Sequence, residues 1–133
     1  MSTGLVIVDM DDSLVAIKGI FEHFQFHHVL VLENEVLVGV ISDRDLLAAL
    51  SPTVGTPAET NRDLAILNKR AHQICTRNPL TVKQKDSVAT AIDIFNQKNV
   101  SCVPVVDNGN RPVGILTQRD ILMYLASIDK KAE

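Results

Sequence analysis

Apolar positions follow a helical period in two separate parts of this chain. Behind Asp12-Ser13, and again behind Asp86-Ser87, apolar residues recur three or four positions apart, which is typical of one face of an amphipathic helix. Each Asp-Ser pair supplies side chains that cap a helix N-terminus. A helix is therefore predicted at each place. Its apolar positions are Leu14, Ile17, Phe21 and Phe24 in the first and Val88, Ala91, Ile92 and Phe95 in the second.

Two β-rich runs joined by a polar link follow each helix, which predicts a hairpin in both places. The runs are His28–Leu32 with Val36–Ile41, and Cys102–Val106 with Val113–Leu116. A second helix is expected after Ser42 or Thr117, and a short apolar strand, Leu5–Val8 or Leu80–Val82, before the first helix. The predicted unit is strand, helix, strand, strand, helix.

The two units are copies of one pattern. Asp12-Ser13 recurs 74 residues later, Val38-Gly39 recurs 75 residues later as Val113-Gly114, and the extra residue falls in the polar turn 107–110. One unit cannot bury both faces of its sheet, so we expect an α/β (α+β) module of two βαββα repeats packed with pseudo-twofold symmetry. Residues 1–50 form the first repeat and 71–133 the second. Residues 51–70 form a linker, with a breaker-rich loop over 51–57 and a short helix expected to pack beside the second repeat.

Composition narrows the class of protein. The chain has 133 residues, 46% of them hydrophobic, and a net charge of -3, which does not indicate a nucleic-acid surface. No apolar run approaches a membrane helix, and Met1–Gly4 carries no basic region typical of a signal peptide, so we expect a cytoplasmic protein. Cys75 and Cys102 are expected to be reduced and structural.

One polar motif recurs where each hairpin meets the second helix. It reads Ser42-Asp43-Arg44-Asp45 in the first copy and Thr117-Gln118-Arg119-Asp120 in the second. One interpretation is a helix cap, because a hydroxyl and an acid three residues later satisfy exposed backbone N–H groups. The other is a ligand site, because a helix N-terminus attracts anions and an Asp there can accept ribose hydroxyls. Both interpretations stay open.

The strand Val100–Asp107 and the closing segment Gly114–Ile121 resemble a cystathionine-β-synthase (CBS) domain, and the two copies together resemble a Bateman module. The resemblance implies a cleft between the repeats that binds AMP, ADP, ATP or S-adenosylmethionine, with the motif Asp holding the ribose and two strands sandwiching the base. In one site the implied residues are Thr81, Val82, Cys102, Val103, Pro104, Thr117, Arg119 and Asp120. In the other they are Ile7, Val8, His28, Val29, Leu30, Ser42, Arg44 and Asp45.

The first copy departs from the family pattern. It has His27 and Leu30 where the second has Ser101 and Pro104, and Ile7 where the second has Thr81. We therefore predict that the site with Thr117 and Asp120 is the stronger one. Asp120→Ala should then lower affinity more than Asp45→Ala.

The sequence supports other functions less well than a ligand sensor. His23, His27 and His28 need not converge, so no metal site is predicted. No nucleophile–base pair or P-loop is present, so the chain is not expected to be an enzyme. A ligand-free interaction module remains the alternative. The resemblance also implies a homodimer, with Leu47, Leu50, Leu122 and Leu125 as candidate interface, and an unidentified regulated protein as partner.

Overall fold

The computed structural model describes residues 4–24, 26–50 and 56–132, with side chains as far as residue 129. Most of the predicted linker loop, residues 51–55, lies outside the described residues, as do residues 1–3. The chain divides into two compact units. The first unit is Val6–Asn78, and the second consists of the described residues of Met1–Leu5 and Pro79–Glu133. Each unit contains most of one sequence repeat, but residues 71–78 of the second repeat belong to the first unit and Leu5 of the first repeat belongs to the second.

A four-stranded sheet with the order β1-β2-β3-β4 forms the base of the first unit. Its strands are β1 (Ile7–Asp9), β2 (His28–Glu33), β3 (Val36–Ser42) and β4 (Thr76–Arg77). β1 runs parallel to β2, and β2, β3 and β4 run antiparallel in turn. The strand and hairpin predicted for this copy are confirmed.

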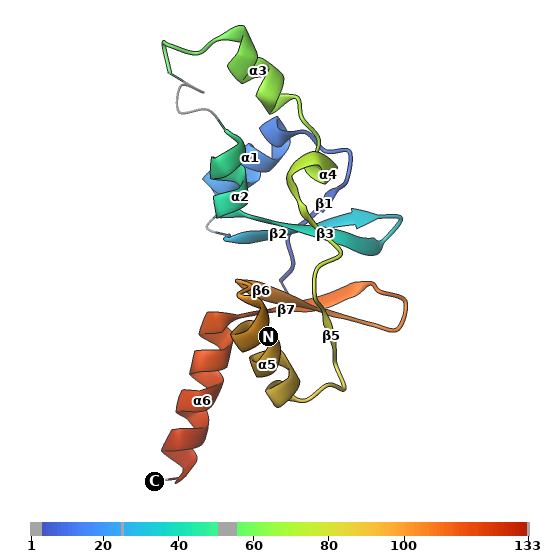
Figure 1. Cartoon of the computed structure of the whole chain (residues 1–133), viewed down its shortest axis with the longest axis vertical. Helices are drawn as coiled ribbons and strands as arrows, with labels where there is room; N and C mark the ends of the chain where they lie inside the picture. The colour runs from blue at the N-terminus through green and yellow to red at the C-terminus, as the bar shows by residue number, and fades with distance from the viewer. Residues whose placement is uncertain (1–3, 25, 51–55, 133) are drawn as a thin grey trace. The chain divides into compact units, whose positions relative to one another are not determined.

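Helices α1 (Leu14–His23), α2 (Asp43–Ala49) and α4 (Ala71–Ile74) lie on the same side of this sheet (Figure 1). Ser13 caps α1 as predicted, because its hydroxyl accepts the Ala16 N–H at 3.3 Å. Between helices and sheet lies one apolar core. Its buried members are Val8, Leu14, Ile17, Val29, Val31, Ile41, Leu46 and Ala71.

The linker helix is present but packs elsewhere than predicted. It is α3 (Asn61–Leu67), capped by Thr60, and it contacts α1 of the first repeat. The expectation that it lies beside the second repeat was wrong, because the chain after it stays with the first unit. Lys69 and Ala71 hydrogen-bond to the backbone around Ser13, and β4 then pairs with β3.

Gly39 allows β4 to approach β3 closely. A Cβ at this position would lie 2.6 Å from Cys75 Sγ and 3.1 Å from the Thr76 carbonyl oxygen. The strand pair Gly39–Arg77 and Val40–Thr76 therefore depends on a residue without a side chain. The first unit, which includes β4, extends to Asn78, whereas the second sequence repeat is expected to begin at residue 71.

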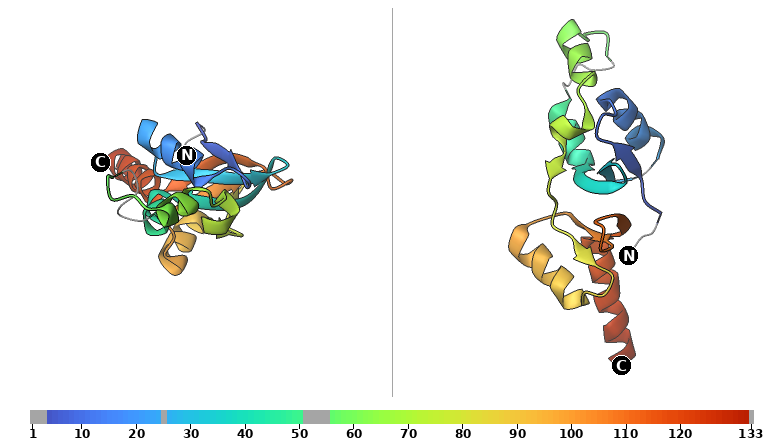
Figure 2. Two further views of the ribbon diagram at one scale, coloured as in Figure 1. Left: turned by 90° about the horizontal axis from the view of Figure 1, so that it is seen from above. Right: turned by 90° about the vertical axis from the view of Figure 1, so that its right-hand side faces the viewer.

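The second unit repeats the pattern with fewer elements in its described part. Its sheet has the order β5-β6-β7, with β5 (Val82–Lys83), β6 (Cys102–Val106) and β7 (Pro112–Thr117). Helices α5 (Val88–Lys98) and α6 (Gln118–Ala132) lie on one side of this sheet and diverge as they leave it (Figures 1 and 2). One core cluster of this unit contains the buried Val82, Val103 and Val105.

Both cysteines are free thiols, as predicted. No helix in the described ranges is both long enough and apolar enough to cross a membrane.

Candidate ligand-binding site

The recurrent motif forms the same capping box in both units. In the first, the Ser42 N–H donates to Asp45 Oδ2 at 2.9 Å and the Asp45 N–H donates to Ser42 Oγ at 3.1 Å. In the second, the Thr117 N–H donates to Asp120 Oδ2 at 2.9 Å and the Asp120 N–H donates to Thr117 Oγ1 at 3.3 Å. The cap interpretation is therefore confirmed for both copies. Each box fixes the side chain of its aspartate in the first turn of the helix that follows a strand.

Capping uses only one oxygen of each carboxylate. Among the described residues, Oδ1 of Asp45 and Oδ1 of Asp120 have no hydrogen-bond partner, and both side chains are half-buried. An ionised carboxylate oxygen accepts hydrogen bonds from hydroxyl groups. The same aspartate can therefore close the helix end and hold a ligand hydroxyl, so the two interpretations of the motif are compatible.

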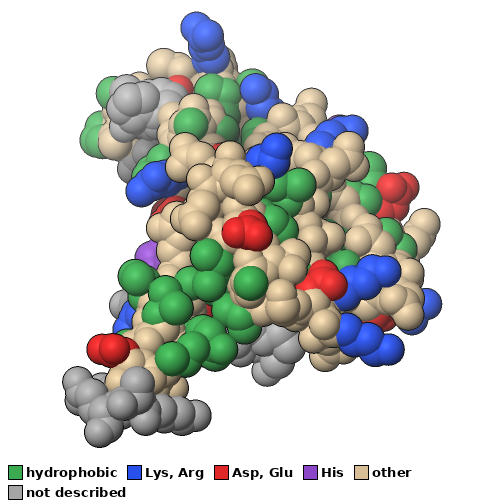
Figure 3. Space-filling view, turned by 60° about the horizontal axis from the view of Figure 1, so that its bottom comes forward, with side chains coloured by type: hydrophobic (Ala, Val, Ile, Leu, Met, Phe, Trp, Pro, Cys, Tyr) green, Lys and Arg blue, Asp and Glu red, His purple; other side chains and the backbone are tan. Residues whose placement is uncertain are grey.

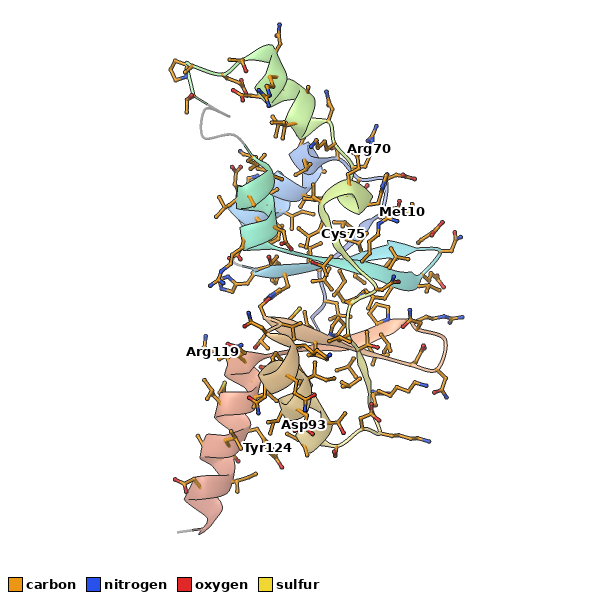
Figure 4. All side chains as sticks on the ribbon, in the orientation of Figure 1. Met10, Arg70, Cys75, Asp93, Arg119 and Tyr124 are labelled. Carbon is orange, nitrogen blue, oxygen red and sulfur yellow. The ribbon has the colours of Figure 1, made fainter. Side chains whose placement is uncertain are left out.

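The arginine inside each motif is available for an anionic group. Arg44 and Arg119 are exposed, and no described side chain forms an ion pair with either guanidinium group (Figure 4 labels Arg119). Lys83 is a weaker candidate, since its Nζ already donates to Asn108 Oδ1 at 3.3 Å.

A histidine occupies the region around the motif in the first unit. Nδ1 of His27 lies 3.0 Å from Asp43 Oδ2, and the Asp43 N–H donates to the His27 carbonyl oxygen at 2.9 Å. The hydrogen bond from the His27 ring holds the pKa of Asp43 below its ordinary value. Burial lowers the pKa of the neighbouring His28 and so favours its neutral ring, although the negative charge of Asp43 acts in the opposite direction.

The second unit has a different pair at these positions. Ser101 takes the place of His27, and Gln118 that of Asp43. Neither residue can form an imidazole–carboxylate pair. The replacement of His27 by Ser101 between the two copies therefore means that the units differ in charge and side-chain size beside the capping box.

The strand residues implied by the resemblance fall into two groups. Val82 and Val103 pack in the core of the second unit, and Val8 and Val29 in that of the first. Because these side chains are buried in the cores, a ligand could contact these residues chiefly through their backbone groups. The remaining strand positions are the buried Leu30, Cys102 and Pro104, the half-buried His28 and Thr81, and Ile7, which is exposed.

A hollow of about 330 Å³ lies on the helix side of the second sheet. Of the residues implied by the resemblance, Val82 and Asp120 line it. Sequence reasoning did not predict this hollow. The signal for it was small: Ala91 stands in α5 where α1 has the larger Ile17.

Metal-ligating side chains do not gather in the part of the chain that the structure describes. No three of its His, Cys, Asp or Glu residues come together in an arrangement that could hold an ion.

The sequence model of the CBS domain matches this chain twice, over residues 1–52 and 71–127. The chain belongs to the CBS domain family. A CBS domain-containing protein of Dictyostelium discoideum is 32% identical over 131 residues, covering 96% of this chain and 89% of the relative. Other relatives are longer proteins, and the chain spans 36% of an uncharacterised protein of Methanocaldococcus jannaschii that is 30% identical.

Solved structures of CBS domain pairs share this fold. The pair of protein MJ0100, crystallised with 5′-methylthioadenosine and S-adenosyl-L-methionine, is 27% identical with a TM-score of 0.74, covering 96% of this chain and 93% of that one. CBSX2 in complex with AMP is 25% identical with a TM-score of 0.73, covering 94% of this chain and 90% of that one. The chain is therefore a CBS domain pair of mixed α and β structure, and similar pairs bind adenosyl ligands.

Proposed function

We propose that this chain is a regulatory module that binds AMP, ADP, ATP or S-adenosylmethionine in a cleft between its two CBS repeats and signals the bound state to a partner protein. The observation that carries the proposal is the capped aspartate at the start of α2 and α6, which keeps one carboxylate oxygen for a ribose hydroxyl. Complexes of similar pairs with adenosyl compounds support the ligand class.

The site that uses the second motif is the stronger of the two. Thr117 and Asp120 would bind the ribose, Arg119 would face a phosphate or carboxylate, and Thr81, Cys102 and Pro104 would border the base. At the first motif, the His27–Asp43 pair places a ring beside the same position, and Asp43 adds a negative charge that repels phosphate. We expect AMP to occupy the second-motif site at lower concentration.

A thermal-shift panel of AMP, ADP, ATP, S-adenosylmethionine and NAD tests the ligand class. A ligand at 100 times its Kd adds about 2.7 kcal/mol to the free energy of unfolding, which raises the Tm of a chain of this size by several degrees. No shift with any of the five compounds would contradict the proposal and favour the ligand-free interaction module.

Asp120→Asn and Asp45→Asn form a matched pair for isothermal titration with the compound that shifts the Tm most. Asparagine keeps one oxygen for the backbone N–H but cannot offer an ionised second oxygen, so it separates ribose binding from helix capping better than alanine does. We expect a loss of about tenfold or more for Asp120→Asn, in line with about 1.5–3 kcal/mol for a hydrogen bond to a charged group. A larger loss for Asp45→Asn would reverse the order of the sites.

The proposal includes no catalytic step. A capped aspartate whose Oδ2 is engaged by a backbone N–H is suited to holding a hydroxyl, and nothing near either motif pairs a nucleophile with a base in the described residues. Absence of turnover in incubations with ATP and S-adenosylmethionine is the expected result.

We also propose a homodimer in the cytoplasm. Apolar side chains gather along α6 on the face shown in Figure 3, and Leu122 and Leu125 are 65% and 46% exposed. Leu47 on α2 is 71% exposed, while Leu50 is half-buried. Such a patch is typical of a protein interface. Light scattering of the purified chain should give twice the mass of one copy, and a monomer would contradict this part of the proposal.

A further inference from the structure

The hollow in the second unit is an apolar groove bordered by polar groups. It lies between β5, the loop after β5, the first turns of α5 and the first turns of α6 (Figure 4 labels Tyr124). Its lining residues are Val82, Lys83, Gln84, Asp86, Ser87, Val88, Ala91, Val105, Leu116, Asp120, Ile121 and Tyr124.

The same place in the first unit is filled by the chain itself. The repeat relates Val82, Val88 and Ala91 to Val8, Leu14 and Ile17, and these belong to the core that includes Ala71. Leu116 and Ile121 correspond to Ile41 and Leu46 of that core. Ala71, at the start of α4, is fully buried among them. The groove is therefore the counterpart of a position that a short segment occupies in the first unit.

Backbone pairing shows how that segment is held. The Leu14 N–H donates to the Lys69 carbonyl oxygen at 2.9 Å, the Ala71 N–H donates to Asp12 O at 2.8 Å, and the His72 N–H donates to Met10 O at 3.0 Å. Figure 4 labels Met10, Arg70 and Cys75 along this stretch. Two extended residues thus pair with the chain before α1, and a single helical turn then places the alanine in the core.

The corresponding backbone groups of the second unit are the Val88 N–H and the carbonyl oxygens of Asp86 and Gln84. None of the three has a hydrogen-bond partner among the described residues. All three residues line the groove and are exposed. The second unit therefore offers both the apolar cavity and the backbone groups that bind Lys69–Ile74 in the first.

We propose that this groove docks a short segment of a partner protein. The segment pairs two or three extended residues with Gln84–Val88 and then forms one helical turn that inserts an alanine-sized side chain. Asp86 and Asp120 border the groove while Lys83 is engaged by Asn108, so basic residues before the small one are favoured, as Lys69 and Arg70 precede Ala71. This docking goes beyond nucleotide binding and does not require it.

A peptide with the sequence of residues 66–74, blocked at both ends, is the probe. The chain contains one tyrosine and no tryptophan, and that tyrosine lines the groove, so the intrinsic fluorescence of Tyr124 reports occupancy directly. Titration of the 133-residue chain without nucleotide should give a saturable change. The same peptide with Ala71→Glu should bind at least tenfold more weakly, because its charge enters an apolar cavity.

Two surface variants of the protein complete the test. Val88 is 37% exposed at the start of α5, and Val88→Glu should weaken peptide binding at least tenfold. Val15, 52% exposed in the first turn of α1, gives the matched control Val15→Glu, which should bind like the wild type. Circular dichroism checks that both variants fold.

Three results would overturn the proposal: no saturable change up to about 1 mM peptide, wild-type binding by Val88→Glu, or an equal loss in Val15→Glu. Because nucleotide is absent from these titrations, failure of the adenosyl ligands to bind leaves this result unaffected. Failure of the peptide to bind likewise leaves the nucleotide titrations unaffected.

Discussion

The two units share one sequence pattern but complete their cores differently. In the first, Ala71 and α4 close the space between α1, α2 and the sheet. In the second, the corresponding space is a hollow of about 330 Å³, and Ala91 stands where the first unit has Ile17. The comparison shows that a βαββα repeat specifies its own sheet and helices, whereas the segment that finishes its core comes from outside the repeat.

A second contrast lies beside the shared capping boxes. The first unit has an imidazole–carboxylate pair, His27–Asp43, where the second has Ser101 and Gln118. All four histidines of the chain belong to the first unit. The two candidate sites therefore share a capped aspartate and differ in the charge around it.

Substitutions at the equivalent positions Ile17 and Ala91 should change the free energy of unfolding in opposite directions, and this is the largest difference that we expect between the two cores. Ile17 is fully buried, so Ile17→Ala should lower the free energy of unfolding by about 3 kcal/mol. Ala91→Ile enters the hollow and should raise it by about 1 kcal/mol, because added methyl groups are buried without displacing neighbours. Urea denaturation followed by circular dichroism measures both. A loss above about 1 kcal/mol in Ala91→Ile would mean that no usable space exists there.

Gly39→Ala tests the close approach of β4 to β3. Among the described residues, only the first unit has such a fourth strand. The new Cβ would meet Cys75 Sγ at 2.6 Å and the Thr76 carbonyl oxygen at 3.1 Å, and should cost about 2 kcal/mol. Gly19→Ala is the matched control, since nothing lies within 4 Å of its Cβ position in α1, and it should stabilise by up to about 1 kcal/mol. Equal effects in thermal unfolding would contradict the close packing of β3 and β4.

Removing the capping hydroxyl should affect the two units alike. Ser42→Ala and Thr117→Ala each delete the acceptor for one backbone N–H, and each should cost about 1 kcal/mol in urea denaturation. A clearly larger cost in one unit would show that its hydroxyl makes structural contacts beyond the cap.

Acidification should destabilise the first unit through His28. Its pKa in the folded chain lies below the ordinary value of 6.5 because of burial, so the unfolded state binds more protons between these two values. Stability is therefore full above 6.5, falls as the pH drops below it, and levels off beneath the folded pKa. Urea denaturation at about pH 7.5 and about pH 5.5 should show this decrease in the wild type. The decrease should be smaller in His28→Gln, and an unchanged decrease would assign it to another group.

Local patterns predicted most of the regular structure. The periodicity behind Asp12-Ser13 and Asp86-Ser87 predicted α1 and α5, and the paired β-rich runs predicted both hairpins. β4 and α4 were not predicted, because a strand of two residues and a helix of four are too short to show a period. The linker helix was predicted, but its neighbour was not, because sequence spacing carries no information about which repeat it contacts.

The repeated motif was enough to name candidate site residues, but it did not show how each aspartate is used. Ser42, Asp45, Thr117 and Asp120 could be named from the repeated motif, but two uses of each aspartate remained possible. Only the coordinates show that Oδ2 accepts the capping hydrogen bond while Oδ1 has no partner among the described residues. The pairing of His27 with Asp43 joins the residue before β2 to the first residue of α2, 16 positions along the chain, and no local pattern predicts it.

The sequence by itself determined the duplication, the order of elements in each copy and the recurrent capped aspartate, because periodicity, turns and capping act over a few residues. The tertiary structure alone decided that the segment around Ala71 closes the core of the first unit and not the hollow of the second. Ala71 and β4 are held by backbone groups and apolar side chains contributed by distant parts of the first unit. The open groove beside Ala91 follows from the same cause, since a cavity is defined by neighbours that are not adjacent in sequence.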